Sequence, residues 1–409
     1  MYTILLMILI LNINNLINYN ILLNQDFISI SLIILSMWIL ILIIISQFNF
    51  NFLNSLYLIF FLLNIRLILS FRVNNIIIFY FFFEWSLIPI FLIIMGWGYQ
   101  LERIKSRFYL LMYTLFASLP LIIIFIILIK LLNRININFL IKMFFFKLNN
   151  FYLLIIYLSF LVKFPIFFFH QWLPKAHVEA PVGGSIILAG ILLKLGGYGI
   201  IRLLFFIELK FIIKIIIVFS LIGGSILRII CLINRDMKVI IAYSSVVHIA
   251  FIIINLFSKN FWNLNGRIII IIAHGLCSSG IFSCANIIYE RTHSRIIIIN
   301  KSNLNYFPSI RLFWFILCIA NFSGPFTYNL LSEILLIISI STINWLFLIF
   351  VIFISFFSAA YRLVLYSNLQ QGLNNNLVFY LSNVNIREIL ILFCHCYTIL
   401  ILLTSSMII

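Results

Sequence analysis

Charged residues are scarce in this sequence, and acidic residues are the rarest of them. Only 9% of the 409 residues are Asp, Glu, Lys or Arg, and nine of them are carboxylates. An ordinary soluble domain carries about a quarter of its residues as charges. Hydrophobic residues make up 65% of the chain. Since a soluble core cannot bury that much apolar surface, the composition excludes a soluble globular protein.

The sequence also lacks the motifs that hold redox cofactors. It has no GxGxxG fingerprint, no His pair at the spacing that haem ligation needs within one helix, and no thiolate set for an iron–sulfur cluster. Of the six cysteines, Cys394 and Cys396 form a lone CxC within an apolar run, which favours buried thiols. His170 and His177 flank QWLPKA in an expected loop, where structural hydrogen bonding is favoured over metal binding. We expect this chain to bind no cofactor and no metal.

Ala, Gly and Pro are scarce, whereas Ile, Phe, Asn and Tyr are abundant. The favoured residues have AT-rich codons, which indicates an AT-rich organellar genome. Lys and Arg number 26, which in a soluble protein would suggest nucleic-acid binding. Here they stand singly at loops and helix ends, so we expect anionic phospholipids as partners and no nucleic acid. Because basic residues occur on both predicted sides, the membrane orientation stays open.

Long apolar runs recur along the whole chain, and a helix needs about 20 such residues to cross a bilayer. Runs such as LIILSMWILILIIIS are apolar on every face, without the alternation of a membrane β-barrel. The first run lacks a basic n-region and a cleavage site, so we interpret it as a retained helix. The pattern predicts an all-α polytopic bundle of about thirteen transmembrane helices. Their expected extents are 2–23, 27–47, 51–71, 75–96, 108–132, 151–171, 182–206, 211–233, 237–257, 264–288, 309–340, 345–366 and 386–408.

Two of these spans contain helix breaks. In LVKFPIFFFHQWLP, Pro165 follows Lys163 by two residues, and proline removes a backbone donor and clashes with the preceding turn. In NFSGPFTYN, Gly324 and Pro325 interrupt a run that is too long for one span. Broken helices at membrane depth recur at the ion sites of transporters. We expect the carbonyls of residues 320–323 to face water or a polar side chain.

Ionisable residues inside the spans are the candidate functional residues, because a charge near the bilayer centre costs about 3 kcal/mol on insertion scales. Titratable groups buried close together suit proton transfer through intervening water. The candidates are Glu84, Lys163, Lys194, His248, His274 and Glu333. Glu84 could instead pin helix packing, and each histidine could be a hydrogen-bonded core residue. For Lys194, snorkelling to an interface does not fit its mid-span position, and the nearby Gly196, Gly197 and Gly199 would let a neighbouring helix or water approach.

Four blocks of sequence resemble one protein family. They are FFFEWSLIPIFLIIMGWGYQLER, FPIFFFHQWLPKAHVEAPVGGSIILAGILLKLGGYGIIR, RDMKVIIAYSSVVHIAF and IAHGLCSSGIFSCANIIYERTHSR. These blocks are similar to the antiporter-like subunits of respiratory complex I, mitochondrial NADH:ubiquinone oxidoreductase, and within that family to subunit 4. The resemblance covers roughly residues 75–340. The first 70 and last 60 residues match only in pattern.

The resemblance implies two inverted five-helix repeats, each with a broken helix and a half-channel. We expect N-terminal helices at 1–74, the first repeat at 75–210, the second at 211–366, and a C-terminal loop and helix at 367–409. Glu84 and Lys163 would be the paired acid and base of the first repeat, and Lys194 the central relay. His248 and His274 would be further relay positions, and Glu333 the terminal residue of the second repeat.

The resemblance also implies a place in a larger enzyme. This chain would pump protons in the mitochondrial inner membrane, coupled to electron transfer elsewhere. FMN, iron–sulfur clusters, NADH and ubiquinone are expected in other subunits. The expected partners are other membrane-arm subunits, especially neighbouring antiporter-like subunits, and phospholipids such as cardiolipin.

One departure from the family concerns the N-terminus. The first essential glutamate of the family lies on the fifth helix, whereas Glu84 falls on the fourth expected span, so we expect one N-terminal helix fewer. Two other functions stay open. A subunit of a multisubunit cation/proton antiporter would share the bundle, and co-purification with NADH dehydrogenase activity would separate the two. A structural scaffold that has lost transport would be expected to have lost some of the six titratable groups, and none is lost.

Overall fold

The computed structural model describes residues 26–47, 53–100, 102–132, 150–203, 210–256, 261–302, 307–343, 345–371 and 384–406. The expected span 2–23, and with it the question of a missing N-terminal helix, lies outside these residues. Within them the chain folds into helices with no named strand, and an isolated antiparallel bridge joins Asp236 and Ile296. The expected all-α architecture is confirmed.

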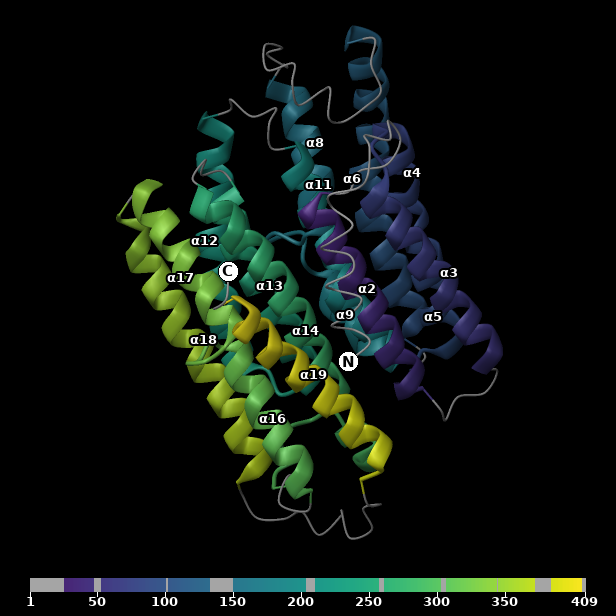
Figure 1. Ribbon diagram of the computed structural model, residues 1–409, viewed down its shortest axis with the longest axis vertical. Helices are drawn as coiled ribbons and strands as arrows, with labels where there is room; N and C mark the ends of the chain where they lie inside the picture. The colour runs from purple at the N-terminus through teal and green to yellow at the C-terminus, as the bar shows by residue number, and fades with distance from the viewer. Residues whose placement is uncertain are drawn as a thin grey trace.

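The helices run roughly along the long axis of the molecule (Figure 1). The N-terminal half contains α2 (Phe27–Ser46), α3 (Leu53–Arg72), α4 (Ile76–Trp85), α5 (Leu87–Trp97), α6 (Arg103–Leu132), α8 (Asn150–Lys163), α9 (Trp172–Glu179), α10 (Val182–Ile187), the π-helix η2 (Leu188–Leu192) and α11 (Leu193–Leu203). The C-terminal half contains α12 (Lys210–Ile233), α13 (Met237–Leu256), α14 (Phe261–Thr292), α16 (Pro308–Asn321), α17 (Tyr328–Ile343), α18 (Phe347–Gln370) and α19 (Ile386–Ser406).

Nine helices among the described residues are long and apolar enough to cross a membrane, judged by length and composition. Three shorter apolar helices are α8, α16 and α17, which flank the two breaks expected from the prolines. Both breaks are confirmed, since residues 164–171 and 322–327 form turns between helices. The expected span 75–96 is confirmed as Ile76–Trp97, and within it two helices, α4 and α5, meet at a kink at Ser86.

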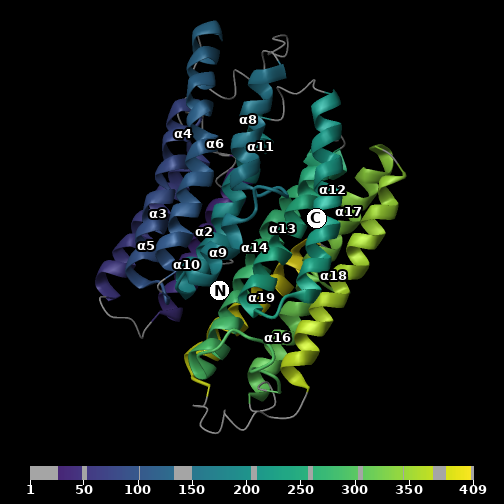
Figure 2. The same ribbon diagram turned by 180° about the vertical axis from the view of Figure 1, so that it is seen from behind.

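Helix α14 lies at the centre of the bundle. It packs against α2, α10 and η2 from the N-terminal half and against α13, α16, α17 and α19 from the C-terminal half. Figures 1 and 2 show α3 and α5 on one side of the molecule and α17 and α18 on the opposite side. Large apolar side chains are exposed on the outer helices, as a lipid-facing surface requires, for example Phe116 on α6 and Phe356 on α18. The centre of the bundle is therefore where a charged side chain would be shielded from lipid.

Candidate functional site

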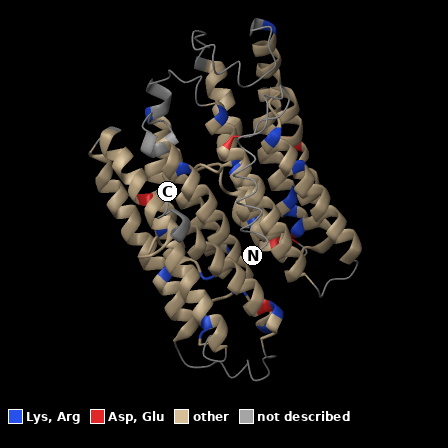
Figure 3. Ribbon diagram, viewed as in Figure 1, with Lys and Arg blue, Asp and Glu red and all other residues tan. Residues whose placement is uncertain are grey.

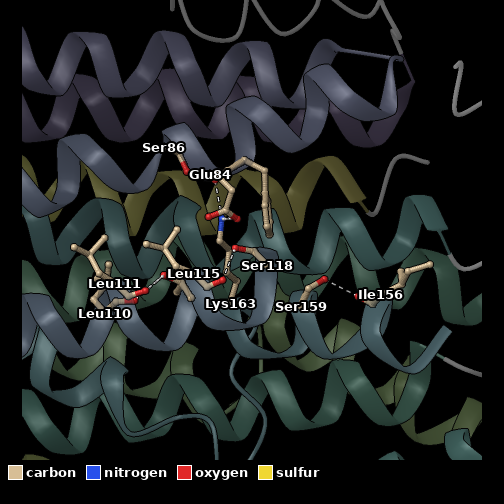
Figure 4. Close-up of polar contacts among 11 residues, drawn as sticks. Glu84, Ser86, Leu110, Leu111, Leu115, Ser118, Ile156, Ser159 and Lys163 are labelled. Carbon is tan, nitrogen blue, oxygen red and sulfur yellow. Dashed lines mark hydrogen bonds and ion pairs between the residues drawn. The ribbon is translucent and has the colours of Figure 1, made fainter. Parts of the chain in front are cut away.

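Charged positions are few along the helices (Figure 3), and Glu84 and Lys163 form one of the ion pairs. The Lys163 ammonium nitrogen lies 2.9 Å from Glu84 Oε1, and both side chains are largely buried. Figure 4 shows the two side chains directed toward each other from α4 and α8. Two opposite charges at this distance offset the desolvation that burial imposes on each. Glu84 and Lys163, which the resemblance implies to be a pair, thus lie in ionic contact.

Phe83, near the kink that ends α4, provides a second partner for Lys163. The carbonyl of Phe83 accepts hydrogen bonds from Lys163 Nζ at 2.7 Å and from the Ser86 hydroxyl at 2.8 Å. The Lys163 ammonium also lies 3.1 Å from the centre of the Phe83 ring, a cation–π distance. The ammonium is thus held by a carboxylate, a carbonyl and an aromatic face.

Prolines determine the backbone on both sides of this pair. Because Pro89 has no N–H, the Trp85 carbonyl lacks its usual helical donor, and Arg66 Nη1 donates to it at 3.1 Å instead. Pro165 likewise ends α8 directly after Lys163. There Ile166 N–H reaches back to the Leu161 carbonyl at 3.0 Å. At the two breaks the Trp85 and Leu161 carbonyls thus both have a donor, and Lys163 lies at a helix end inside the bundle.

Lys194 lies two residues beyond the π-helix η2, at the start of α11. A π-turn shifts the hydrogen-bond register of a helix and often occurs at functional sites. Here the carbonyl of Ala189, inside the π-turn, accepts from Lys194 Nζ at 2.5 Å. The same ammonium lies 3.0 Å from His274 Nδ1 on α14. Lys194 is thus fully buried and held by one carbonyl and one imidazole.

A second cluster continues from Lys194 into the C-terminal half. The rings of His274 and His248 lie 5.1 Å apart between centroids. His248 Nδ1 lies 3.5 Å from Glu333 Oε1 on α17, and both imidazoles are buried. Lys194, His274, His248 and Glu333 therefore form a continuous series of titratable groups that crosses from α11 through α14 and α13 to α17.

The second break supports the Glu333 end of this series. The carbonyl of Ala320, left at the end of α16, accepts from the Asn329 side chain at 2.6 Å. The hydroxyl of Thr327 donates to the Gly324 carbonyl at 2.7 Å. The expectation that a carbonyl before the Gly-Pro break meets a polar side chain is confirmed at Ala320.

The structure thus divides the six expected residues into two groups. Among the described residues, no hydrogen bond or ion pair joins the Glu84–Lys163 pair to Lys194. The two lysines nevertheless lie on adjacent helices, because α8 packs directly against α11. The backbone nitrogen of Phe164 lies 2.8 Å from the position where a Cβ of Gly196 would stand. The expectation that glycines beyond Lys194 admit a neighbouring helix is confirmed.

Two buried arginines belong to the second cluster and were missed by the sequence reasoning. Nη2 of Arg362, on α18, lies 2.5 Å from His248 Nε2. Arg228, on α12, is fully buried, and its charge acts electrostatically on Glu333. The available signal was an arginine within an apolar run in each case. Arg362 was expected near the end of its span, but α18 continues to Gln370.

The environment of His170 and His177 corrects another expectation. Trp172–Glu179 forms helix α9 instead of a loop. The His177 ring stacks on Phe282 at a centroid distance of 4.5 Å, and neither ring nitrogen has a hydrogen-bond partner among the described residues. His170 stacks on Phe167 at 5.3 Å. Both histidines are therefore aromatic packing residues in this structure.

Comparisons with known proteins agree on one family. The family model described as "NADH:quinone oxidoreductase/Mrp antiporter, TM" matches residues 73–358. The protein named NADH-ubiquinone oxidoreductase chain 4 from Ceratitis capitata is 45% identical over 96% of this chain and 89% of its own length. The protein of the same name from Aedes aegypti is 48% identical over 80% of this chain and 73% of its own.

Solved structures share the fold at low sequence identity. A chain of respiratory complex I from Thermus thermophilus with bound NADH superimposes with a TM-score of 0.85 at 20% identity, over 94% of this chain and 82% of that one. A chain of the Mrp complex from a Dietzia species gives a TM-score of 0.83 at 13% identity, with the same coverage. The chain is a multi-pass membrane protein and belongs to the NADH:quinone oxidoreductase/Mrp antiporter family, and within it to the NADH-ubiquinone oxidoreductase chain 4 group.

Proposed function

We propose that this chain is a proton-translocating membrane subunit of NADH:ubiquinone oxidoreductase and that the residues identified above carry the proton. The single observation that carries the proposal is the contact between Lys194 and His274, 3.0 Å apart in the middle of the bundle. An ammonium and an imidazole at this distance can exchange a proton, and such buried ionisable groups mark proton pathways. The names of the curated relatives support the enzyme.

Each residue has a distinct role in this proposal. Glu84 and Lys163 act as the paired acid and base, since the charge of each stabilises the charge of the other. Separating the pair lowers the proton affinity of Lys163, and the released proton then moves through water toward Lys194. His274 and His248 pass the proton on, and Glu333 receives it.

Electron transfer belongs to other subunits in this proposal. FMN, the iron–sulfur clusters, NADH and ubiquinone are bound there, and this chain responds to a conformational or electrostatic change in its neighbours. Other membrane-arm subunits, including antiporter-like ones, are the proposed partners. The mitochondrial inner membrane is the proposed location, with anionic phospholipids such as cardiolipin around the basic loops and helix ends.

A subunit of a cation/proton antiporter is the second candidate function. The likeness to the Mrp complex chain supports the shared fold. The identity of 45% to a chain 4 relative favours the oxidoreductase. Isolation of the native membrane complex distinguishes the two candidate functions, because an oxidoreductase subunit must co-purify with NADH-to-quinone activity and an antiporter subunit need not.

The role of Lys194 is tested with Lys194→Met in the assembled enzyme reconstituted into liposomes. Methionine keeps the apolar stem but removes the ammonium, so Ala189 and His274 lose their donor. We expect the number of protons pumped per NADH oxidised to fall. Lys175→Met, at an exposed lysine on α9, is the matched control. Wild-type pumping by Lys194→Met would contradict the proposed function.

A further inference from the structure

Arg362 occupies the acceptor site of a relay histidine. Its side chain is buried on α18, and Nη2 lies 2.5 Å from His248 Nε2. A guanidinium carries five N–H donors and no acceptor, and it stays protonated in proteins. His248 Nε2 must therefore accept this hydrogen bond through its lone pair.

This contact fixes the tautomer of His248. With Nε2 as acceptor, the ring proton of the neutral imidazole is on Nδ1. That nitrogen lies 3.5 Å from Glu333 Oε1. The Nδ1 proton thus lies within ion-pair distance of Glu333, without a hydrogen bond to it, and the only lone pair of the ring is covered by Arg362.

His274 has the opposite tautomer. The Lys194 ammonium donates to Nδ1, so the ring proton is on Nε2. Nε2 has no hydrogen-bond partner among the described residues. His274 therefore holds a proton beside a neighbouring ring, yet His248 has no free lone pair to receive it.

We propose that Arg362 is a movable, positively charged gate between the two histidines of the relay. This proposal rests on the proposed function and adds a positioning residue to it. While the guanidinium stays on His248 Nε2, no proton can enter His248. When it turns away, the lone pair becomes free and the relay conducts.

The surroundings of Arg362 supply the partner for the open position. Its Nε and Nη1 have no hydrogen-bond partner in the described part of the chain, although both are buried. Glu333 is the nearby carboxylate, and both Arg362 and Arg228 act on it electrostatically. Turning toward Glu333 would exchange an imidazole acceptor for a carboxylate, and charge-assisted bonds to a carboxylate are the stronger kind.

One complete transfer balances as follows. Lys194 gives a proton to His274 Nδ1, His274 gives its Nε2 proton to His248 Nε2, and His248 gives its Nδ1 proton to Glu333. Lys194 ends neutral, Glu333 ends protonated, and both rings end neutral with inverted tautomers. His248 Nε2 then carries a hydrogen and cannot accept from Arg362. The gate therefore cannot close again until the rings have returned to their first tautomers, which favours one proton per opening.

The test compares Arg362→Gln and Arg362→Lys in the assembled enzyme reconstituted into liposomes. Glutamine can either donate or accept and carries no charge, so it no longer forces Nε2 to remain an acceptor. We expect Arg362→Gln to raise the passive proton leak several-fold under an imposed membrane potential, without substrate, and to lower the protons pumped per NADH while quinone reduction continues. Arg362→Lys keeps the charge and should leak little more than wild type. Arg72→Gln, at an exposed arginine on α3, is the control.

Wild-type leak and pumping in Arg362→Gln would overturn the gate, as would equal leaks in the Gln and Lys variants. Adding Lys194→Met to Arg362→Gln separates this proposal from the proposed function. A leak that Lys194→Met abolishes runs through the relay, whereas a leak that it leaves unchanged contradicts the relay itself. If Arg362→Gln does not assemble, electron cryomicroscopy of the wild-type enzyme at rest and in turnover gives the answer. The gate predicts a turnover class with Arg362 on Glu333, and a guanidinium that stays on His248 in every class overturns it.

Discussion

The side-chain amide of Asn329 donates a hydrogen bond to the carbonyl of Ala320 across the break between α16 and α17, at 2.6 Å. Both helix ends lie in the buried part of the bundle, where water cannot take the place of this donor. Asn329→Leu should therefore destabilise the subunit by about 1–3 kcal/mol, because the Ala320 carbonyl loses this short hydrogen bond and keeps the long one from the Ser323 N–H, at 3.4 Å. The thermal transition of the assembled complex measures this effect. Asn54→Leu, at an exposed asparagine on α3, is the control. Equal transitions in the two variants would show that the break is stabilised by other contacts.

Gly196 determines how closely α11 approaches the end of α8. A Cβ at this position would stand 2.8 Å from the backbone nitrogen of Phe164 and 3.0 Å from the carbonyl of Phe160. Gly196→Ala should separate the helices and destabilise the chain by about 1–3 kcal/mol, as overpacking in cores does. Because Phe164 adjoins Lys163, pumping should fall as well.

Gly96→Ala is the matched control for this change, since no atom lies within 4 Å of its added Cβ. It should leave stability unchanged or raise it slightly, because alanine is the better helix former. Complex yield and proton pumping of the two variants are measured together. A Gly196→Ala enzyme that matches Gly96→Ala in both would contradict the close-packing argument.

A buried ion pair anchors the last described helix. Arg291 Nη2 on α14 lies 2.5 Å from Glu388 Oε2, and the same oxygen accepts from the Asn385 N–H at 3.1 Å, at the start of α19. Glu388→Leu removes the carboxylate partner of the buried Arg291 and should cost about 3–5 kcal/mol. The double variant Arg291→Met with Glu388→Leu should recover part of that loss, because the buried positive charge is removed as well. Chemical unfolding of the solubilised complex checks this order, and a double variant less stable than the single one would refute it.

Much of the fold could be predicted from the sequence because its signals are local. Apolar runs and prolines act within a few residues, so the breaks at Pro165 and Pro325 and most span limits follow from the pattern. The kink at Ser86 has a local signal of the same kind, because Pro89 leaves the Trp85 carbonyl without its helical donor, but that proline was not assigned a break. The π-turn before Lys194 was also missed, because Leu188–Leu192 reads as ordinary helix.

The candidate site was predictable residue by residue but not in its contacts. A charge in an apolar run is visible in the sequence, and so Glu84, Lys163, Lys194 and Glu333 were found. Their partners depend on which helices pack together, and the contact of Lys194 with His274 needs α11 against α14. Arg362 was overlooked for a related reason. The expected span ended at residue 366, which placed Arg362 near a helix end, whereas α18 continues to Gln370 and buries Arg362 inside the bundle.

The Glu84–Lys163 pair gives the most direct test of the proton-pumping account, through Glu84→Gln and Glu84→Asp in the assembled enzyme. Glutamine leaves the Lys163 ammonium buried without its counter-charge, whereas aspartate keeps the charge with a shorter reach. Glu102→Gln, at an exposed glutamate, is the control. The protons pumped per NADH and the rate of NADH-to-quinone electron transfer are measured together in liposomes. The account predicts that both fall in Glu84→Gln and fall less in Glu84→Asp. Wild-type pumping and turnover in Glu84→Gln would show that the pair is structural and would contradict the account.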